Sequence, residues 1–463
     1  MTAVVLRRRP RWCAKLAYVV VLALFAAWGL QDIALEDASL LYVSKDDHEE
    51  SVEPKFELRQ EDTTKTFLNR SIDREAELRV MERLRAKKRP PTLPEHPLLA
   101  HNRSLPVVSV LAWPLVDQGA QTAVQMHLQE NGIAESPFLR MAGPDDTDFV
   151  WLADIGGNTP WKVWCDMLLE RVQKTPASYR PVVFIVDLTD HPAVARCPKV
   201  EATVGADHVF YSTRSVAVDR HWDQDWVDRG RRLPLSNLRG VSYQHTPLYV
   251  RTDIVEELER ILLEEYNATL MDPMERLERS CDVSHFWPID GQAVSTYGAN
   301  LRHRVSELVA TQSDLEVFVG LKGDAVRTGR RTAQSEYLRQ MLRSKIVVVT
   351  QRDSWEDHYR LMEALVSGAM ILTDFMFGLP DGLINGTSVV LFSSAEELVS
   401  SMHYYIENDE ERLEIARRGR EVAMSRHRTW HRVEEIVFGK PRSMSTDPLC
   451  VYVTHVHEGC FGQ

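Results

Sequence analysis

The sequence predicts an α/β protein with two Rossmann-like domains facing a cleft, preceded by an N-terminal transmembrane helix and a stem. Three observations support this fold class. The chain has 463 residues, too many for one hydrophobic core, and 44% of them are hydrophobic. Short apolar runs alternate with helical patterns over residues 106–440, as expected for βαβ units with a parallel sheet. A segment without charge follows a basic N-terminus.

The N-terminus predicts a cytosolic basic tail at residues 1–15 and a transmembrane signal-anchor at residues 16–35. Residues 16–30 carry no charge and follow a cluster of basic residues, whereas residues 32–62 hold eleven acids against three bases. This asymmetry orients the basic end toward the cytosol. A short span suits the membranes of the Golgi or endoplasmic reticulum, so we expect a single-pass type II protein with a lumenal body. A cleaved signal peptide is the alternative.

Residues 36–105 predict a stem, because they are acidic and then mixed in charge and hold no sustained apolar pattern. Four N-glycosylation sequons begin at Asn69, Asn102, Asn267 and Asn385, which agrees with a lumenal body. The net charge of −12 makes a nucleic-acid partner unexpected.

The six cysteines fit an oxidising compartment. Cys13 precedes the anchor and five others follow it, and an oxidising lumen permits disulfides among these five. Cys450 with Cys460 closes the shortest loop, but the sequence does not fix the partners. One of the five thiols stays unpaired unless it bridges to another chain. The spacing matches no structural zinc motif, so no structural metal is expected.

The body divides into an N-terminal Rossmann-like domain at residues 106–275, a C-terminal Rossmann-like domain at residues 276–440, and a tail at residues 441–463. Apolar runs predict strands and amphipathic patterns predict helices in both domains. The run at 181–188 is typical of a strand covered on both faces. The predicted strands are 107–113, 148–155, 181–188, 208–213, 241–250, 282–287, 315–320 and 345–350, and the predicted helices are 161–174, 253–268, 301–311 and 333–343. A further helix is expected through about Gln129, with Gly132 as its stop signal.

Residues 344–374 read as a strand, a charged loop, a helix and a second strand. Ser354 is the expected N-cap of the helix, Asp357 completes a capping box, and Gly368 ends the helix. The loop lies at the carboxyl end of a parallel strand, where α/β proteins bind ligands.

Glu363 stands beside the apolar stripe of this helix. A carboxylate at that edge is costly to desolvate unless a group donates hydrogen bonds to it, and a pair of ligand hydroxyls is one such group. The alternative is an ordinary surface glutamate paired with Arg360.

Three segments of the second domain resemble the C-terminal domain of the GT-B glycosyltransferases of the "glycosyl transferases group 1" type, including CgeB-like and exostosin-like proteins. They are "EYLRQMLRSKIVVV" (336–349), "RLMEALVSGAMILTD" (360–374) and the stretch 385–433, read with "CDVSHFWPIDG" (281–291). The resemblance implies a GT-B fold in which Glu363 and Gly368 take the positions of the "EAxxxG" helix, whose glutamate binds the ribose of a nucleotide sugar.

The resemblance also implies that cations and a helix N-terminus, in place of a metal or other cofactor, stabilise the nucleoside diphosphate that leaves. Arg352 is the first candidate, followed by Lys322, while Arg360 and Ser354 complete the predicted donor-binding set. The alternative is a carboxylate-bound metal at Asp223-Gln224-Asp225.

The acceptor is expected to bind the N-terminal domain. Asp117 follows the first predicted strand and Asp187 lies at the end of the strand predicted at 181–188, and both are the candidate catalytic residues. His431 and Trp430 are expected to pack in a final helix that crosses back to the first domain.

The predicted function is transfer of a sugar from a nucleotide-sugar donor to a glycan or protein acceptor. Many relatives carry a second glutamate eight residues before the ribose-binding one, and this chain has Trp355 there. That departure favours the main alternative, a catalytically inactive relative that binds glycans or acts as a scaffold. A nucleotide-sugar epimerase is the other alternative.

Overall fold

The computed structural model describes fifteen segments of the chain. They are residues 108–114, 131–141, 150–155, 161–175, 181–187, 196–213, 216–219, 231–232, 242–245, 249–287, 300–320, 335–351, 355–356, 359–376 and 379–460. The predicted anchor and stem lie outside them. In these segments no helix combines the length and apolar character needed to cross a bilayer.

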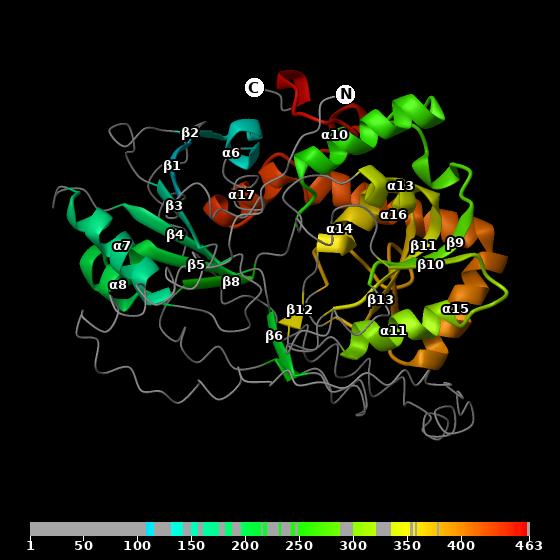
Figure 1. Cartoon of the computed structure of the whole chain (residues 1–463). Coiled ribbons are helices and arrows are strands. Elements are labelled where there is room, and N and C mark those ends of the chain that lie inside the picture. The colour runs from blue at the N-terminus through cyan, green and yellow to red at the C-terminus, as the bar shows by residue number, and fades with distance from the viewer. Residues whose placement is uncertain are drawn as a thin grey trace, which may run out of the picture. The chain divides into compact units, whose positions relative to one another are not determined.

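The first half contains a parallel six-stranded sheet in the order β2-β1-β3-β4-β5-β8 (Figure 1). Its strands are β1 Val108–Pro114, β2 Leu139–Met141, β3 Val150–Ile155, β4 Val182–Asp187, β5 Val209–Thr213 and β8 Ser242–His245. Its helices are α6 Gly132–Glu135, α7 Trp161–Gln173 and α8 Pro198–Val204. All six residues of β4 are buried, which confirms the strand predicted from the continuous apolar run.

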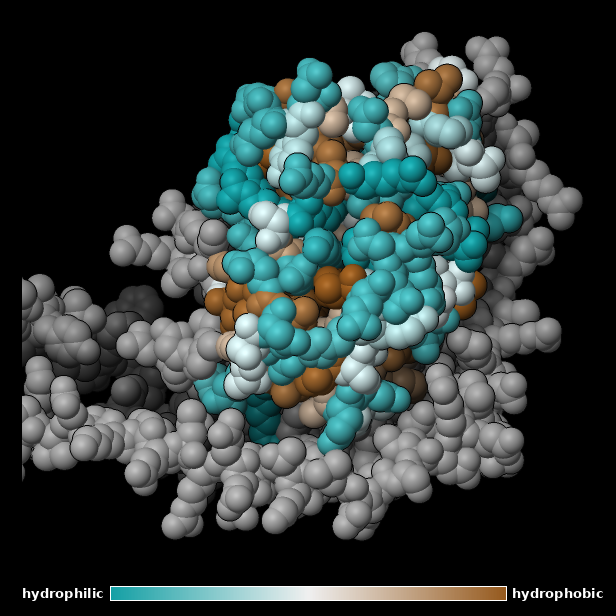
Figure 2. All heavy atoms as spheres, turned by 90° about the vertical axis from the view of Figure 1, so that its right-hand side faces the viewer, coloured by the Kyte–Doolittle hydropathy of each residue, from teal (hydrophilic) through white to brown (hydrophobic). Residues whose placement is uncertain are grey.

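The second half contains a parallel five-stranded sheet in the order β10-β9-β11-β13-β14. Its strands are β9 Cys281–His285, β10 Val317–Val319, β11 Ser344–Val349, β13 Met370–Asp374 and β14 Val390–Phe392. The helices in this part of the chain are α10 Thr252–Ile261, α11 Asn300–Ala310, α13 Ser335–Arg343, α14 Tyr359–Val366, α15 Ala395–Glu407, α16 Asp409–Arg426, α17 Thr429–Phe438 and α18 Pro448–Val451. On the side that carries α15 and α16, hydrophilic residues cover most of the described surface, and patches of apolar residues are visible between them (Figure 2).

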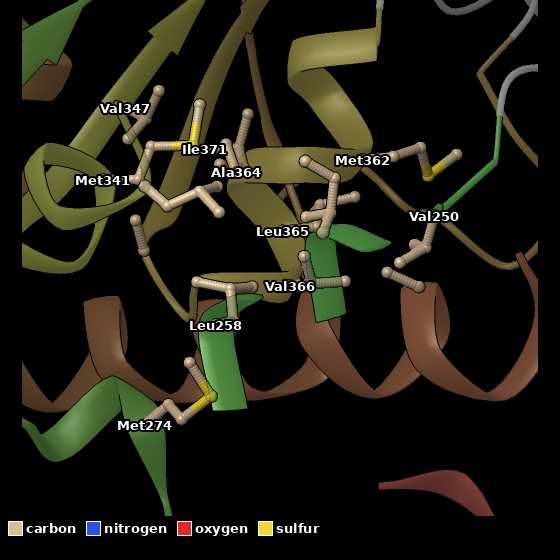
Figure 3. Close-up of a cluster of buried hydrophobic side chains, with 14 of the residues drawn as sticks. Val250, Leu258, Met274, Met341, Val347, Met362, Ala364, Leu365, Val366 and Ile371 are labelled. Atoms are coloured by element: carbon tan, nitrogen blue, oxygen red, sulfur yellow. The ribbon is translucent and has the colours of Figure 1, made fainter. Parts of the chain in front are cut away.

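Two helices pack on the half other than the one their place in the sequence suggests. Leu258 of α10 joins the core of the second sheet beside Met341 and Ile371 (Figure 3), although α10 falls within the predicted first domain. Val433 and Val437 of α17 join the core of the first sheet, as expected for a final helix that crosses back. Helix α10 therefore belongs with the second core.

Gly132 permits the close approach of α17 to the first half. It is the first residue of α6, and the helix predicted through about Gln129 lies outside the described residues. A Cβ atom there would lie 2.5 Å from Cγ2 of Val433 and 3.1 Å from the Thr429 carbonyl oxygen. Only a residue without a side chain fits between these two atoms.

A third, small sheet links segments that are far apart in the sequence. Strand β12 (Trp355–Glu356) pairs antiparallel with β6 (Val216–Asp219), which also pairs with β7 (Arg231–Arg232). Helix α14 consequently begins at Tyr359, and the predicted helix start with Ser354 as N-cap is wrong. The main chain at 355–356 makes strand hydrogen bonds in place of a first helical turn.

Arg279 joins three main-chain segments of the second half. Its guanidinium donates to the carbonyl oxygens of Met341, Ser344, Met274 and Ser367 at 2.8–3.1 Å. Burial lowers the pKa of Arg279 to about 10. The carbonyls of Met341, Ser344 and Ser367 lie where α13 and α14 end, so one buried side chain donates to helix-terminal acceptors of both helices.

Two disulfides form within the described residues. Cys165 bonds to Cys197 and Cys450 bonds to Cys460, while Cys281 is buried and unpaired. The expectation of one unpaired thiol is confirmed, and the shortest loop is indeed closed.

Candidate functional site

The candidate site lies where strands β9, β11 and β13 of the second sheet end. Parallel strands present their carboxyl ends at one edge, and helices that follow them begin there. Phe286 and Trp287 follow β9, Thr350 and Gln351 follow β11, and Asp374 ends β13. The Gln351 backbone N–H donates to Oδ1 of Asp374 at 2.8 Å, which ties the ends of two neighbouring strands together.

Glu363 is a buried carboxylate of this region. Its apolar neighbours on α14, Met362, Leu365 and Val366, anchor the helix in the second core (Figure 3). Glu363 itself is only 5% exposed, so it is not an ordinary surface glutamate. Its Oε2 accepts a hydrogen bond from the hydroxyl of Tyr337 at 2.7 Å. A buried carboxylate needs such donors because desolvation of a charge is costly.

A cluster of aromatic side chains packs around Tyr337. Its ring lies edge-on to Phe286 with 4.8 Å between ring centroids, and Phe286 lies 5.7 Å from Phe318 of β10. Tyr337 is 6% exposed and Phe286 is fully buried. The carboxylate of Glu363 therefore stands beside an apolar wall built from α13, β10 and the end of β9.

Two guanidinium groups flank Trp287. The Cζ atom of Arg302, from α11, lies 5.0 Å from the centre of the indole ring, and that of Arg360, from α14, lies 5.8 Å from it. Both distances are within the range of cation–π attraction. Nε of Arg302 also donates to the Thr350 carbonyl oxygen at 3.3 Å. The ends of β9 and β11 and the start of α14 thus share a cationic region.

His285 adds no charge to this region. It is the last residue of β9, and its Nδ1 and Nε2 lie 2.9 Å from the Val348 oxygen and 3.3 Å from the Arg302 oxygen. Burial lowers the pKa of His285 to about 4, and the charges of Arg360 and Arg302 add to that effect. The ring is neutral at pH 7, so the two arginines supply the positive charge.

Four of the eight predicted site residues fall within the described segments. Glu363 and Arg360 lie on α14 at the candidate site, and Asp187 ends β4 of the first sheet with 5% exposure. Gly368 follows α14 with a φ of +73°, and a Cβ there would lie 3.0 Å from Cβ of Met274. The backbone conformation and the lack of space therefore already favour glycine at position 368. The ligand-binding role of Gly368 stays a prediction.

The remaining predicted residues lie outside the described segments. They are Asp117, Lys322, Arg352 and Ser354, together with the alternative metal-binding pair Asp223 and Asp225. Within the described segments no group of three or more histidines, cysteines or acids is placed to hold a metal ion.

The sequence analysis missed Tyr337, Trp287 and Arg302. Tyr337 occupies an apolar position of an amphipathic helix, where packing is the usual role. Trp287 lies two residues beyond β9, at the end of the strand predicted at 282–287, and its place at a strand end was the available signal. Arg302 lies in the first turn of α11 and reaches the site because α11 packs on β9 and β10.

The fold and this region define a class of protein: a two-sheet parallel α/β protein with a buried carboxylate and paired guanidiniums at its strand ends. Residues 297–437 match the family described as glycosyl transferase-like. The resemblance predicted from the sequence is confirmed over these residues. Comparison with curated protein sequences gave no significant match.

Several solved structures align with the chain at low similarity. Anabaena Alr3699/HepE in complex with UDP aligns with a TM-score of 0.36 and 12% identity, over 71% of this chain and 98% of that one. Sucrose-phosphate synthase from Thermosynechococcus elongatus aligns with a TM-score of 0.38 and 12% identity, over 72% and 97%. TarM of S. aureus aligns with a TM-score of 0.35 and 14% identity, over 59% and 57%. Likenesses at this level carry no weight for the function.

Proposed function

We propose that this protein is a glycosyltransferase that moves a sugar from a nucleotide-sugar donor to a glycan or protein acceptor. The observation that carries the proposal is the buried carboxylate of Glu363, which lies within the segment matched to the glycosyl transferase-like family. A buried carboxylate is suited to accept hydrogen bonds from the two neighbouring ribose hydroxyls of a nucleotide, because each oxygen offers two lone pairs.

Arg302 and Arg360 are the proposed partners of the donor diphosphate. Sugar transfer leaves negative charge on this group, and fixed guanidiniums stabilise that charge without moving during the reaction. Their shared contact with Trp287 holds both side chains in one region. Arg352, Lys322, Ser354 and Gly368 remain the sequence-based candidates for further donor contacts, and no metal is required in this mechanism.

Asp187 is the proposed catalytic residue of the first half, with Asp117 as the second candidate. Asp187 stands at the carboxyl end of β4, the position where parallel α/β sheets place reactive groups. In this proposal it accepts a proton from the acceptor hydroxyl. We propose, in addition, that the two halves face each other across a cleft.

We also propose a Golgi or endoplasmic-reticulum location with a type II anchor and a lumenal body. Two disulfides support this location, because such bonds persist in oxidising compartments. The sequon residues Asn267 and Asn385 are exposed, which suits glycan attachment. Endoglycosidase treatment of protein from a secretory host tests the location, and unchanged gel mobility would argue against it.

The activity test measures release of UDP or GDP when the purified protein is incubated with nucleotide sugars and candidate acceptors. The Glu363→Gln variant keeps the shape of the side chain and removes its charge. Charged hydrogen bonds contribute about 1.5–3 kcal/mol each, so we expect the donor KM to rise about 10- to 100-fold. The matched control is Glu201→Gln, another carboxylate with 5% exposure that accepts a tyrosine hydroxyl. A donor KM that rises equally in both variants would exclude the role of Glu363.

The second candidate function is that of a catalytically inactive glycosyltransferase relative that binds glycans or acts as a scaffold. Trp355 stands where many relatives have a glutamate, and it belongs to the strand β12 that pairs with β6. Binding of UDP or GDP without turnover of any nucleotide sugar would favour this candidate over the transferase.

A further inference from the structure

Tyr337 forms a side-chain hydrogen bond with Glu363. Its hydroxyl donates to Oε2 at 2.7 Å, and both residues are more than nine-tenths buried. Tyr337 lies in the first turn of α13, whereas Glu363 lies on α14, so the hydrogen bond joins two helices of the second half. The phenol and the carboxylate are 26 residues apart in the sequence.

The direction of the phenol hydroxyl is fixed by packing. Phe286 blocks one side of the Tyr337 ring at 4.8 Å, and Phe318 supports Phe286 in turn. The ring therefore cannot change rotamer without displacing buried aromatic side chains. In such an apolar environment a hydrogen bond to a charged oxygen is stronger than in water.

We infer that Tyr337 is a positioning residue that orients Glu363 for recognition of a vicinal diol in the ribose of the donor. This inference rests on the proposed function and deepens it. The carboxylate is planar and has four lone-pair sites, of which the phenol takes one on Oε2. This hydrogen bond restricts rotation about the last side-chain bond of Glu363 and so holds the plane of the carboxylate in one orientation. Two hydroxyls on neighbouring carbons can then bind both oxygens at once.

A positioning role makes a prediction that a purely structural role does not. If Tyr337 acts through Glu363 on the diol, its loss affects only ligands that carry both hydroxyls. A 2′-deoxynucleotide lacks one of them and leaves an acceptor of Glu363 unpaired with or without Tyr337. The effect of Tyr337→Phe should also disappear when Glu363 is already replaced, because residues that act as a unit are not additive.

The experiment measures the Kd of the full chain for UDP and GDP and for their 2′-deoxy forms by calorimetry. The variants are Tyr337→Phe, Glu363→Gln and the double variant. The matched control is Tyr211→Phe, which removes a buried tyrosine–glutamate hydrogen bond of 2.6 Å from the first half. Thermal unfolding of each variant reports how much stability is lost.

For whichever nucleotide binds the wild type, we expect Tyr337→Phe to weaken binding about fivefold to tenfold, and to change binding of the 2′-deoxy form less than twofold. In the Glu363→Gln background, adding Tyr337→Phe should raise the Kd by less than a further twofold. The control Tyr211→Phe should leave all Kd values unchanged. Equal weakening of both ligand forms, or full additivity with Glu363→Gln, would overturn the positioning role while the proposed function stands. Failure of the wild type to bind either nucleotide at millimolar concentration would overturn the proposed function, and the inference with it.

Discussion

His431 provides a sharp test of how burial sets the acid stability of this protein. It is 3% exposed on α17, the helix that packs on the first core. Its Nδ1 accepts from the Arg428 backbone N–H at 3.3 Å, and its Nε2–H donates to the Ser443 carbonyl oxygen at 3.1 Å. This pattern requires the neutral ring, since a proton on Nδ1 would meet the Arg428 N–H. Burial lowers the pKa of His431 to about 3 from the ordinary 6.5, and the nearby arginine charges of Arg428 and Arg432 act in the same direction.

The sign of the effect follows from proton binding. Below pH 6.5 the unfolded chain binds a proton at this position and the folded chain does not, so the free energy of unfolding falls as the pH falls. Each pH unit costs about 1.4 kcal/mol for one such group. Between pH 7.5 and pH 5 His431 should therefore remove about 2 kcal/mol of stability, and the loss should continue down to about pH 3. A loss of this size is a large part of a total that is typically about 5–15 kcal/mol.

The proposed substitution is His431→Gln, which does not titrate. Other groups also respond to acid: burial lowers the pKa of His427 and His285, which adds to the loss, and raises the pKa of Glu434, which opposes it. The difference between wild type and variant removes these shared contributions. We expect the free energy of unfolding of the wild type, taken relative to that of the variant, to fall by about 2 kcal/mol between pH 7.5 and pH 5. The assay is urea unfolding followed by tryptophan fluorescence at several pH values. Parallel curves for the two proteins would refute the reasoning.

Two further predictions concern stability. Gly368→Ala should lower the free energy of unfolding by about 2–4 kcal/mol, because the left-handed backbone and the 3.0 Å approach to Met274 both oppose a Cβ. Gly386→Ala, at a similar positive φ with nothing within 4 Å, should cost only about 1–2 kcal/mol. Equal losses in urea unfolding would exclude the steric contribution. Replacing Cys450 and Cys460 by serine should cost about 3 kcal/mol by loop-closure entropy, and an unchanged urea midpoint would contradict this estimate.

The order of strands and helices in the two halves followed from local patterns. Continuous apolar runs correctly predicted β4 and β11, because a parallel strand covered on both faces has no polar side. Amphipathic spacing likewise predicted α13, with an end that agrees with the structure. Glu363 was found in the same way, as a charge beside an apolar stripe. These features depend on residues within one or two turns of each other.

Other features depended on segments distant in the sequence. The helix predicted after Ser354 failed because residues 355–356 pair with β6, which lies about 140 residues earlier. The sequence also did not reveal that the apolar face of α10 packs beside α13 and the second sheet. Local propensity contains no information on which distant partner a segment meets.

The sequence by itself determined a chain of alternating strands and helices and a carboxylate at position 363 that required a partner. Only the tertiary structure decided that Tyr337 donates to that carboxylate and that the guanidiniums of Arg302 and Arg360 both lie close to the ring of Trp287. The physical reason is that the two kinds of information act over different distances along the chain. Periodicity reports how one element divides its faces between core and solvent, whereas a hydrogen bond or a cation–π contact between elements exists only after packing has brought them within a few ångströms.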